Sequence, residues 1–161
     1  MLTQIAILII LLFLSGFFSS AETALFSISQ TKARHLAKSG GHAGTLISRM
    51  KEDPHRLLTT ILIGNNVVNV GAASLATSLA IGAFPGYAVG IATGIMTFLI
   101  LVFGEVFPKS IATRNNILIA RIAIYPIYWL SILFFPVLIF LNFIPYLTGK
   151  IKKSPRVTEE E

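Results

Sequence analysis

Apolar positions along the chain fall into four long runs. The runs cover residues 2–26, 57–82, 87–111 and 117–147. Each of them is longer than the roughly 20 residues that a helix needs to cross a bilayer. A transmembrane β-barrel would instead show segments of about 10 residues with alternating hydrophobicity, and the sequence has no such pattern. The pattern therefore predicts an all-α integral membrane protein.

The polar, basic stretch 28–56 separates the first two runs. It predicts two short cytoplasmic helices that break near Gly40-Gly41, because glycine is unfavourable inside a helix. Asp53 followed by Pro54 predicts a helix start, with the aspartate as N-cap and the proline at the first helical position.

The last run, 117–147, contains Pro126, Pro136 and Pro145. Proline removes a backbone donor and kinks a helix. If this run crossed the membrane, the basic segment KIKKSPR after it would lie outside, against the positive-inside rule. We therefore predict three crossing helices and a proline-bent juxtamembrane belt helix that wraps them on the cytoplasmic side. A fourth crossing is the alternative.

Composition and charge agree with a membrane protein and suggest its orientation. Only 12% of the 161 residues are charged, whereas soluble domains carry about 25% charged residues. The net charge of +6 could suggest nucleic-acid binding, but the cations flank the apolar runs, as the positive-inside rule describes. We predict a multi-pass protein of the cell membrane, with its N-terminus outside, its C-terminus cytoplasmic and no nucleic-acid partner. The flanking cations are Lys32, Arg34, Lys38, Arg49, Lys51, Arg56, Lys109, Arg114, Arg121, Lys150, Lys152, Lys153 and Arg156.

Enzyme chemistry finds little support in the sequence. The chain has no cysteine, which excludes disulfides, thiolate metal sites and a cysteine nucleophile. His35, His42 and His55 are dispersed within the basic stretch. The sequence shows no HExxH motif, no serine–histidine–aspartate arrangement and no glycine-rich phosphate loop. We therefore do not expect an enzyme.

The segment LVFGEVFPKS places Glu105 inside an apolar run, three residues before Pro108. Charges at membrane depth are costly and usually face a protein interior or a water-filled cavity. Pro108 has no N–H to donate to the Gly104 carbonyl, which leaves that oxygen available, and glycine allows close approach of an ion or another backbone. We expect Pro108 to break the helix beside a functional Glu105. The alternative is an ion pair between Glu105 and Lys109.

Further polar residues in the apolar runs share helical faces with one another. Ser20, Thr23 and Ser27 lie on one face of the first helix, and Asn66 and Asn69 on one face of the second. Hydroxyl, amide, carbonyl and carboxylate oxygens are the ligands that Mg²⁺ and Ca²⁺ prefer, and Na⁺ could use the same oxygens. We predict a metal site formed by Ser20, Ser27, Asn66, Asn69 and Glu105, with Asn65, Gly104, Thr23 and Glu22 as secondary candidates. For Glu22, an interhelical contact is an equal alternative.

Three stretches together resemble the transmembrane domain of the CNNM/CorC family of magnesium transporters, in its prokaryotic form. They are SGFFSSAETALFSIS (15–29), LLTTILIGNNVVNV (57–70) and FGEVFPKSIA (103–112). The resemblance implies three crossing helices with a belt-like juxtamembrane helix, a homodimer, and transport of Mg²⁺ that bacterial members exchange for Na⁺. It also implies a cytoplasmic CBS module farther along the same polypeptide. Carried over by motif, it points to the same five ligands.

We therefore expect residues 1–150 to form a CNNM/CorC-type domain and residues 151–161 to begin the linker to the CBS module. The expected function is Na⁺-coupled Mg²⁺ efflux by alternating access. A membrane module that senses Mg²⁺, or acts as a scaffold, and regulates another transporter is the main alternative. A channel would need a continuous polar path, and residues 79–100 offer few polar side chains.

Overall fold

The computed structural model describes residues 2–39, 41–83, 88–137 and 139–140. Within these ranges the chain is helical and forms no strand. The α-helices and the one π-helix, η1, follow in the order α1 (Leu2–Ser27), α2 (Gln30–Lys38), α3 (His42–Glu52), α4 (Pro54–Ala83), α5 (Ala88–Leu99), η1 (Ile100–Val106), α6 (Phe107–Arg114) and α7 (Asn116–Leu133).

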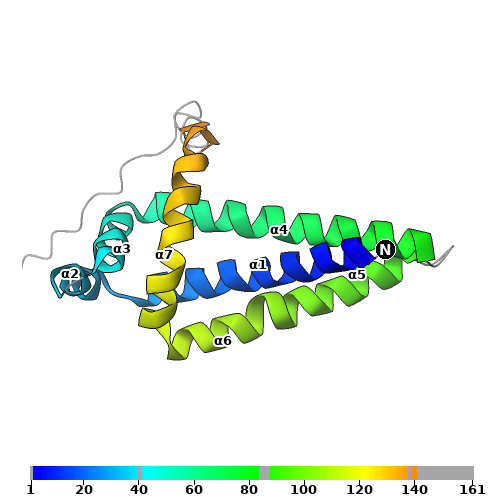
Figure 1. The fold of residues 1–161 in the computed structure, drawn as a ribbon, viewed down its shortest axis with the longest axis horizontal. Coiled ribbons are helices and arrows are strands. Elements are labelled where there is room, and N and C mark those ends of the chain that lie inside the picture. The colour runs from blue at the N-terminus through cyan, green and yellow to red at the C-terminus, as the bar shows by residue number, and fades with distance from the viewer. Residues whose placement is uncertain (1, 40, 84–87, 138, 141–161) are drawn as a thin grey trace, which may run out of the picture.

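Three long helical rods lie side by side, and α7 runs across them (Figure 1). The rods are α1, α4 and the continuous α5–η1–α6 segment. All three, and α7 as well, are long and apolar enough to cross a membrane. Because α7 lies crosswise, it follows the membrane plane when the three rods cross. This arrangement agrees with three spans and a belt helix.

Helix starts and stops follow the local sequence signals. The predicted break between the two short helices lies between α2, which ends at Lys38, and α3, which begins at His42. Helix α4 begins at Pro54, and the Asp53 carboxylate accepts a hydrogen bond from the Arg56 backbone N–H at 3.0 Å. These predictions are confirmed. Residues 84–87, Pro145 and the expected linker 151–161 lie outside the described residues.

The proline content of the last run has less effect than expected. Helix α7 continues through Pro126 and reaches Leu133, with Phe134 as its C-cap. A proline ring removes one hydrogen bond, and packing compensates for this loss, because Ile124 and Ile127 on either side are fully buried. The belt helix α7 therefore ends at its C-cap Phe134, two residues before Pro136, and not at Pro126.

The main hydrophobic core lies where α7 crosses the ends of α1, α3 and α4. Its fully buried members include Leu25, Ile28, Ile47, Leu57, Ile124 and Ile127. Farther along the rods, large apolar side chains such as Phe13 point outward and are exposed, as expected for a surface that faces lipid. The rods themselves are joined by small residues. A Cβ on Gly64 of α4 would lie 2.4 Å from the Phe18 ring of α1.

Candidate cation site

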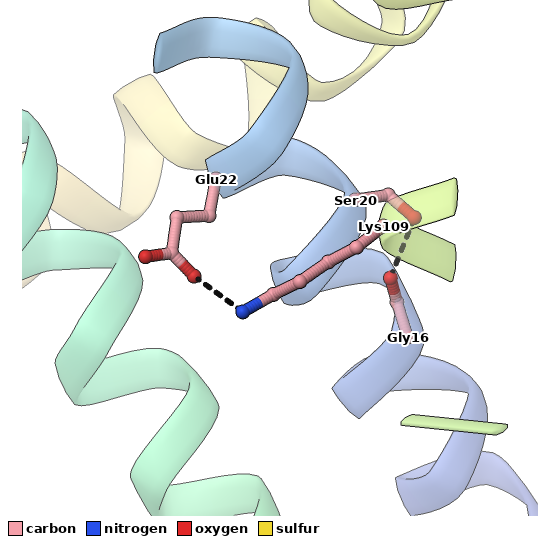
Figure 2. A network of polar contacts seen from close by, with 4 residues as sticks. All are labelled: Gly16, Ser20, Glu22 and Lys109. Atoms are coloured by element: carbon pink, nitrogen blue, oxygen red, sulfur yellow. Dashed lines mark hydrogen bonds and ion pairs between the residues drawn. The ribbon is translucent and has the colours of Figure 1, made fainter. Parts of the chain in front are cut away.

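Three of the predicted ligands do not offer free, buried oxygens. The Ser20 hydroxyl donates to the Gly16 carbonyl at 2.7 Å, as Figure 2 shows. The Ser27 hydroxyl donates to the Ala24 carbonyl at 3.0 Å, and Ser27 is exposed. Asn66 is also exposed. Both serine hydroxyls are therefore hydrogen-bonded to backbone carbonyls of α1 itself, and the Asn66 side chain lies on an exposed face of α4.

Four other side-chain oxygens on α1 and α4 are buried without a hydrogen-bond partner. They are Ser15 Oγ, Ser19 Oγ, Asn65 Oδ1 and Asn69 Oδ1. Each pair is four residues apart, so its members share a helical face, and α1 packs against α4. Asn69 was a predicted ligand and Asn65 a secondary one, whereas the two serines were not predicted. Their signal in the sequence is this repeated spacing of four on two neighbouring helices.

Ser15 and Ser19 differ from other hydroxyl residues of the same bundle. Thr60, Thr77 and Thr93 each donate to the carbonyl four residues earlier, at 2.7–2.9 Å. Serine and threonine in membrane helices commonly form this bond, yet neither buried serine does so. A buried polar group without a partner costs about 1–3 kcal/mol. A ligand that binds oxygen atoms would remove this cost.

The third rod changes its winding next to these oxygens. In η1 the hydrogen bonds span five residues, and the Phe107 N–H donates to the Val102 carbonyl. The predicted break at Pro108 does not occur. The π-helix ends just before Pro108, which lies in the first turn of α6, where a missing N–H is tolerated. Single π-turns within α-helices are rare and often mark functional sites.

Gly104 brings this π-helix against α1. It is buried, and a Cβ on it would lie 2.5 Å from Ser15 Oγ. One residue along α1, a Cβ on Gly16 would lie 3.1 Å from Pro108 Cγ. Glycine is needed at both positions for this close approach of the two rods. The contact places Ser15 beside the residue that precedes Glu105.

Glu105 itself is half-buried, and within the described part of the chain it has no ion-pair or hydrogen-bond partner. The alternative pairing with Lys109 is not formed. Lys109 Nζ instead lies 3.6 Å from Glu22 Oε2 on α1 (Figure 2). The interhelical interpretation of Glu22 is therefore the one the structure shows. Glu105 thus remains without a partner, one residue after the glycine that approaches Ser15.

The four partnerless side chains and Glu105 offer only oxygen atoms as possible metal ligands. One carboxylate, two amide oxygens and two hydroxyls suit a hard cation such as Mg²⁺ or Ca²⁺ rather than zinc or copper. No group of three or more histidine, cysteine, aspartate or glutamate side chains that could hold a metal occurs among the described residues. Of the secondary candidates, Gly104 contacts Ser15 and Thr23 is half-buried on α1.

A cavity of about 470 Å³ lies on another side of α1. Apart from Ser20, it is lined by apolar residues of α1, η1, α6 and α7. Because the Ser20 hydroxyl is bonded to the Gly16 carbonyl, the cavity presents no uncommitted hydroxyl. It is therefore a lipophilic groove, separate from the partnerless oxygens.

Comparison with known proteins places the chain in a family. The family model described as the CNNM, or cyclin M, transmembrane N-terminal domain matches residues 6–161. A DUF21 domain-containing chloroplastic protein of Arabidopsis thaliana is 40% identical over 160 residues, which cover 96% of this chain and 24% of that protein.

Two further relatives come from other kingdoms. The UPF0053 inner membrane protein YfjD of Escherichia coli is 37% identical over 129 residues, covering 80% of this chain and 30% of that protein. The metal transporter cnnm-2 of Caenorhabditis elegans is 30% identical over 141 residues, covering 83% of this chain and 17% of that protein. The chain thus spans less than a third of the length of these relatives. It belongs to the CNNM family and corresponds to the multi-pass transmembrane domain of that family.

Proposed function

We propose that this domain transports Mg²⁺ through a site formed by Ser15, Ser19, Asn65, Asn69 and Glu105. The observation that carries the proposal is the set of four buried, partnerless oxygens on α1 and α4, together with an unpaired carboxylate on η1 one residue after Gly104, which approaches Ser15. A cation would satisfy the oxygens and neutralise the charge together. Mg²⁺ usually keeps several waters and uses one or two carboxylates, so a single glutamate with hydroxyl and amide oxygens is a suitable set.

This site keeps Asn69 and Glu105 from the sequence-based set and exchanges the other three ligands. Ser15 and Ser19 take the place of Ser20 and Ser27, because the latter hydroxyls donate to backbone carbonyls. Asn65 takes the place of Asn66, because the Asn65 side-chain oxygen is buried and the Asn66 side chain is exposed.

Transport further requires two conformations with different affinity for the ion. We propose that the rods slide at their glycine contacts, Gly104 against Ser15 and Gly64 against Phe18, and expose the site to one membrane side at a time. Na⁺ entering by its gradient would use the same oxygens and reset the site. The name of the worm relative, a metal transporter, supports metal transport as the general activity.

Orientation and assembly are part of the same proposal. The basic helices α2 and α3 lie together at one end of the bundle, and the N-terminus lies at the other end (Figure 1). The positive-inside rule then makes the α2–α3 end cytoplasmic. On α5, a Cβ on Gly90 or Gly94 would meet nothing within 4 Å, so this small-residue edge does not pack within the chain. Such an edge is suited to close packing with another helix, in agreement with a homodimer.

The test is Mg²⁺ flux in proteoliposomes with and without an opposing Na⁺ gradient. Asn65→Ala and Asn66→Ala are matched variants, since they remove neighbouring amides on one helix. We expect flux that depends on the Na⁺ gradient, is lost in Glu105→Gln and Asn65→Ala, and persists in Asn66→Ala. Mg²⁺ binding without flux would support the sensor or scaffold alternative, and flux indifferent to Na⁺ would exclude the exchange. Normal flux in Glu105→Gln would overturn the proposed site.

A further inference from the structure

The ion pair between Glu22 and Lys109 joins two rods just beyond the candidate site. Lys109 Nζ lies 3.6 Å from Glu22 Oε2, and neither side chain is fully buried, with 42% and 29% exposed. Figure 2 shows the lysine side chain extending from α6 to meet the carboxylate on α1. It is the one ion pair that the structure gives among the described residues.

Glu22 and Lys109 lie about one helical turn beyond candidate ligands on the same helical faces. Glu22 lies three residues after Ser19 on α1, which is about 4.5 Å along the axis at 1.5 Å per residue. Lys109 lies four residues after Glu105, a spacing at which helical side chains are neighbours. The chain directions place both shifts toward the α2–α3 end of the bundle. The pair therefore stands between the site and that end.

Lys109 thus has two carboxylates within reach. One is Glu22, with which it is paired, and the other is the unpaired Glu105 on its own rod. An ammonium on Glu105 would neutralise the charge that a metal ion needs. An ammonium on Glu22 leaves that charge available.

We propose that Lys109 is a tethered counter-cation that alternates between Glu22 and Glu105, and that Glu22 is the residue that holds it away from the site. The structure shows the state that is ready to bind a cation. Transfer of the ammonium to Glu105 replaces the departing Mg²⁺ and favours its release. This inference rests on the proposed cation site and adds two positioning residues to it.

Single neutral substitutions test the inference because it predicts opposite signs for the two partners. Lys109→Gln removes the competing cation, so Mg²⁺ binds more tightly, but release slows and both KM and kcat for flux fall. Glu22→Gln frees Lys109 to pair with Glu105, so Mg²⁺ binds more weakly and KM rises. We expect changes in affinity of roughly 5- to 150-fold, the range typical of coupling between two sites. The double variant behaves like Lys109→Gln, because Glu22 acts only through the lysine.

Affinity is measured from the Mg²⁺-dependent shift in thermal unfolding of the full chain in detergent, and KM and kcat from proteoliposome flux. Arg114→Gln is the control, since it removes an exposed cation from the last turn of α6 and is expected to leave affinity near the wild-type value. Exposed ion pairs contribute little to stability, so the variants are expected to fold.

The outcomes separate this inference from the proposed function. If both single variants shift affinity in the same direction, or neither shifts it, the pair is only a structural link and the inference is wrong while the site stands. If wild type binds no Mg²⁺, the proposed function fails and the inference fails with it. Opposite shifts, with the double variant matching Lys109→Gln, support the tethered counter-cation.

Discussion

Replacing Ser19 by alanine should stabilise the ion-free protein while weakening its response to Mg²⁺. Ser19 is fully buried and its hydroxyl has no hydrogen-bond partner. Removing a buried, unsatisfied polar group relieves a cost of about 1–3 kcal/mol. For a chain of this size, 1 kcal/mol corresponds to about 2–4 °C in Tm. A rise in Tm of several degrees is therefore expected without Mg²⁺.

Addition of Mg²⁺ should reduce this advantage. At a concentration of about 100 times the wild-type Kd, binding stabilises the wild type by about 2.7 kcal/mol. If the loss of one oxygen ligand weakens binding about tenfold, the variant gains only about 1.4 kcal/mol at the same concentration, by the same relation. The lead of the variant over the wild type then shrinks by about 1.3 kcal/mol, which is the difference between those two gains.

The neighbouring serine provides a matched control. Ser20→Ala removes a hydroxyl that already donates to the Gly16 carbonyl at 2.7 Å. We expect a small loss of stability, on the order of 1 kcal/mol, and an unchanged Mg²⁺ shift. Thermal unfolding of purified protein in detergent, with and without Mg²⁺, measures both quantities. If Ser19→Ala lowers Tm and keeps the full Mg²⁺ shift, the argument from partnerless oxygens is refuted.

Three further predictions follow from other contacts. Gly104→Ala places a Cβ 2.5 Å from Ser15 Oγ, so we expect the variant to lose about 1–3 kcal/mol of stability through overpacking and to bind Mg²⁺ more weakly. Thermal unfolding with and without Mg²⁺ measures both effects, and unchanged unfolding would mean that the rods are not in tight contact. Arg56 donates to Ser131 Oγ at 3.0 Å and so ties α7 to α4; Arg56→Met should loosen the belt helix, seen as faster amide hydrogen exchange in α7 and not in α5, whereas equal protection would show that the tie is dispensable. Burial lowers the pKa of Lys51 from 10.5, so the unfolded chain binds more protons than the folded chain between the two pKa values, and stability rises with pH until the pH reaches 10.5. Lys51→Met should remove this rise in unfolding free energy in a pH titration followed by denaturant unfolding, and an identical rise in the variant would contradict the assignment.

The architecture could largely be predicted from the sequence because it depends on local and coarse signals. Run length and charge predicted three membrane rods, and Asp53-Pro54 predicted the start of α4. Gly40-Gly41 predicted the interruption between α2 and α3. The crosswise course of α7 also agrees with the charge argument, even though Pro126 does not interrupt the helix.

The ligand set was harder to predict. Helical periodicity shows which residues of one helix share a face, but it does not show which other helix that face contacts. Ser20, Thr23 and Ser27 share a face, yet Ser20 lines the apolar cavity between α1, α6 and α7. Only the packing of the rods shows that Ser15, on a neighbouring face, meets η1 at Gly104 and that α1 packs against α4. Likewise, Pro108 indicated an irregular backbone, but whether the helix breaks or widens depends on its neighbours, and it widens into η1.

The most direct test of the central claim is a calorimetric titration of the purified chain with Mg²⁺, comparing wild type with Glu105→Gln, Asn65→Ala and Asn66→Ala. The account predicts saturable binding in wild type and Asn66→Ala, weak binding in Asn65→Ala and none in Glu105→Gln. Wild-type binding in Glu105→Gln, or loss in Asn66→Ala with retention in Asn65→Ala, would contradict a site built from the buried oxygens of α1 and α4 and the Glu105 carboxylate of η1.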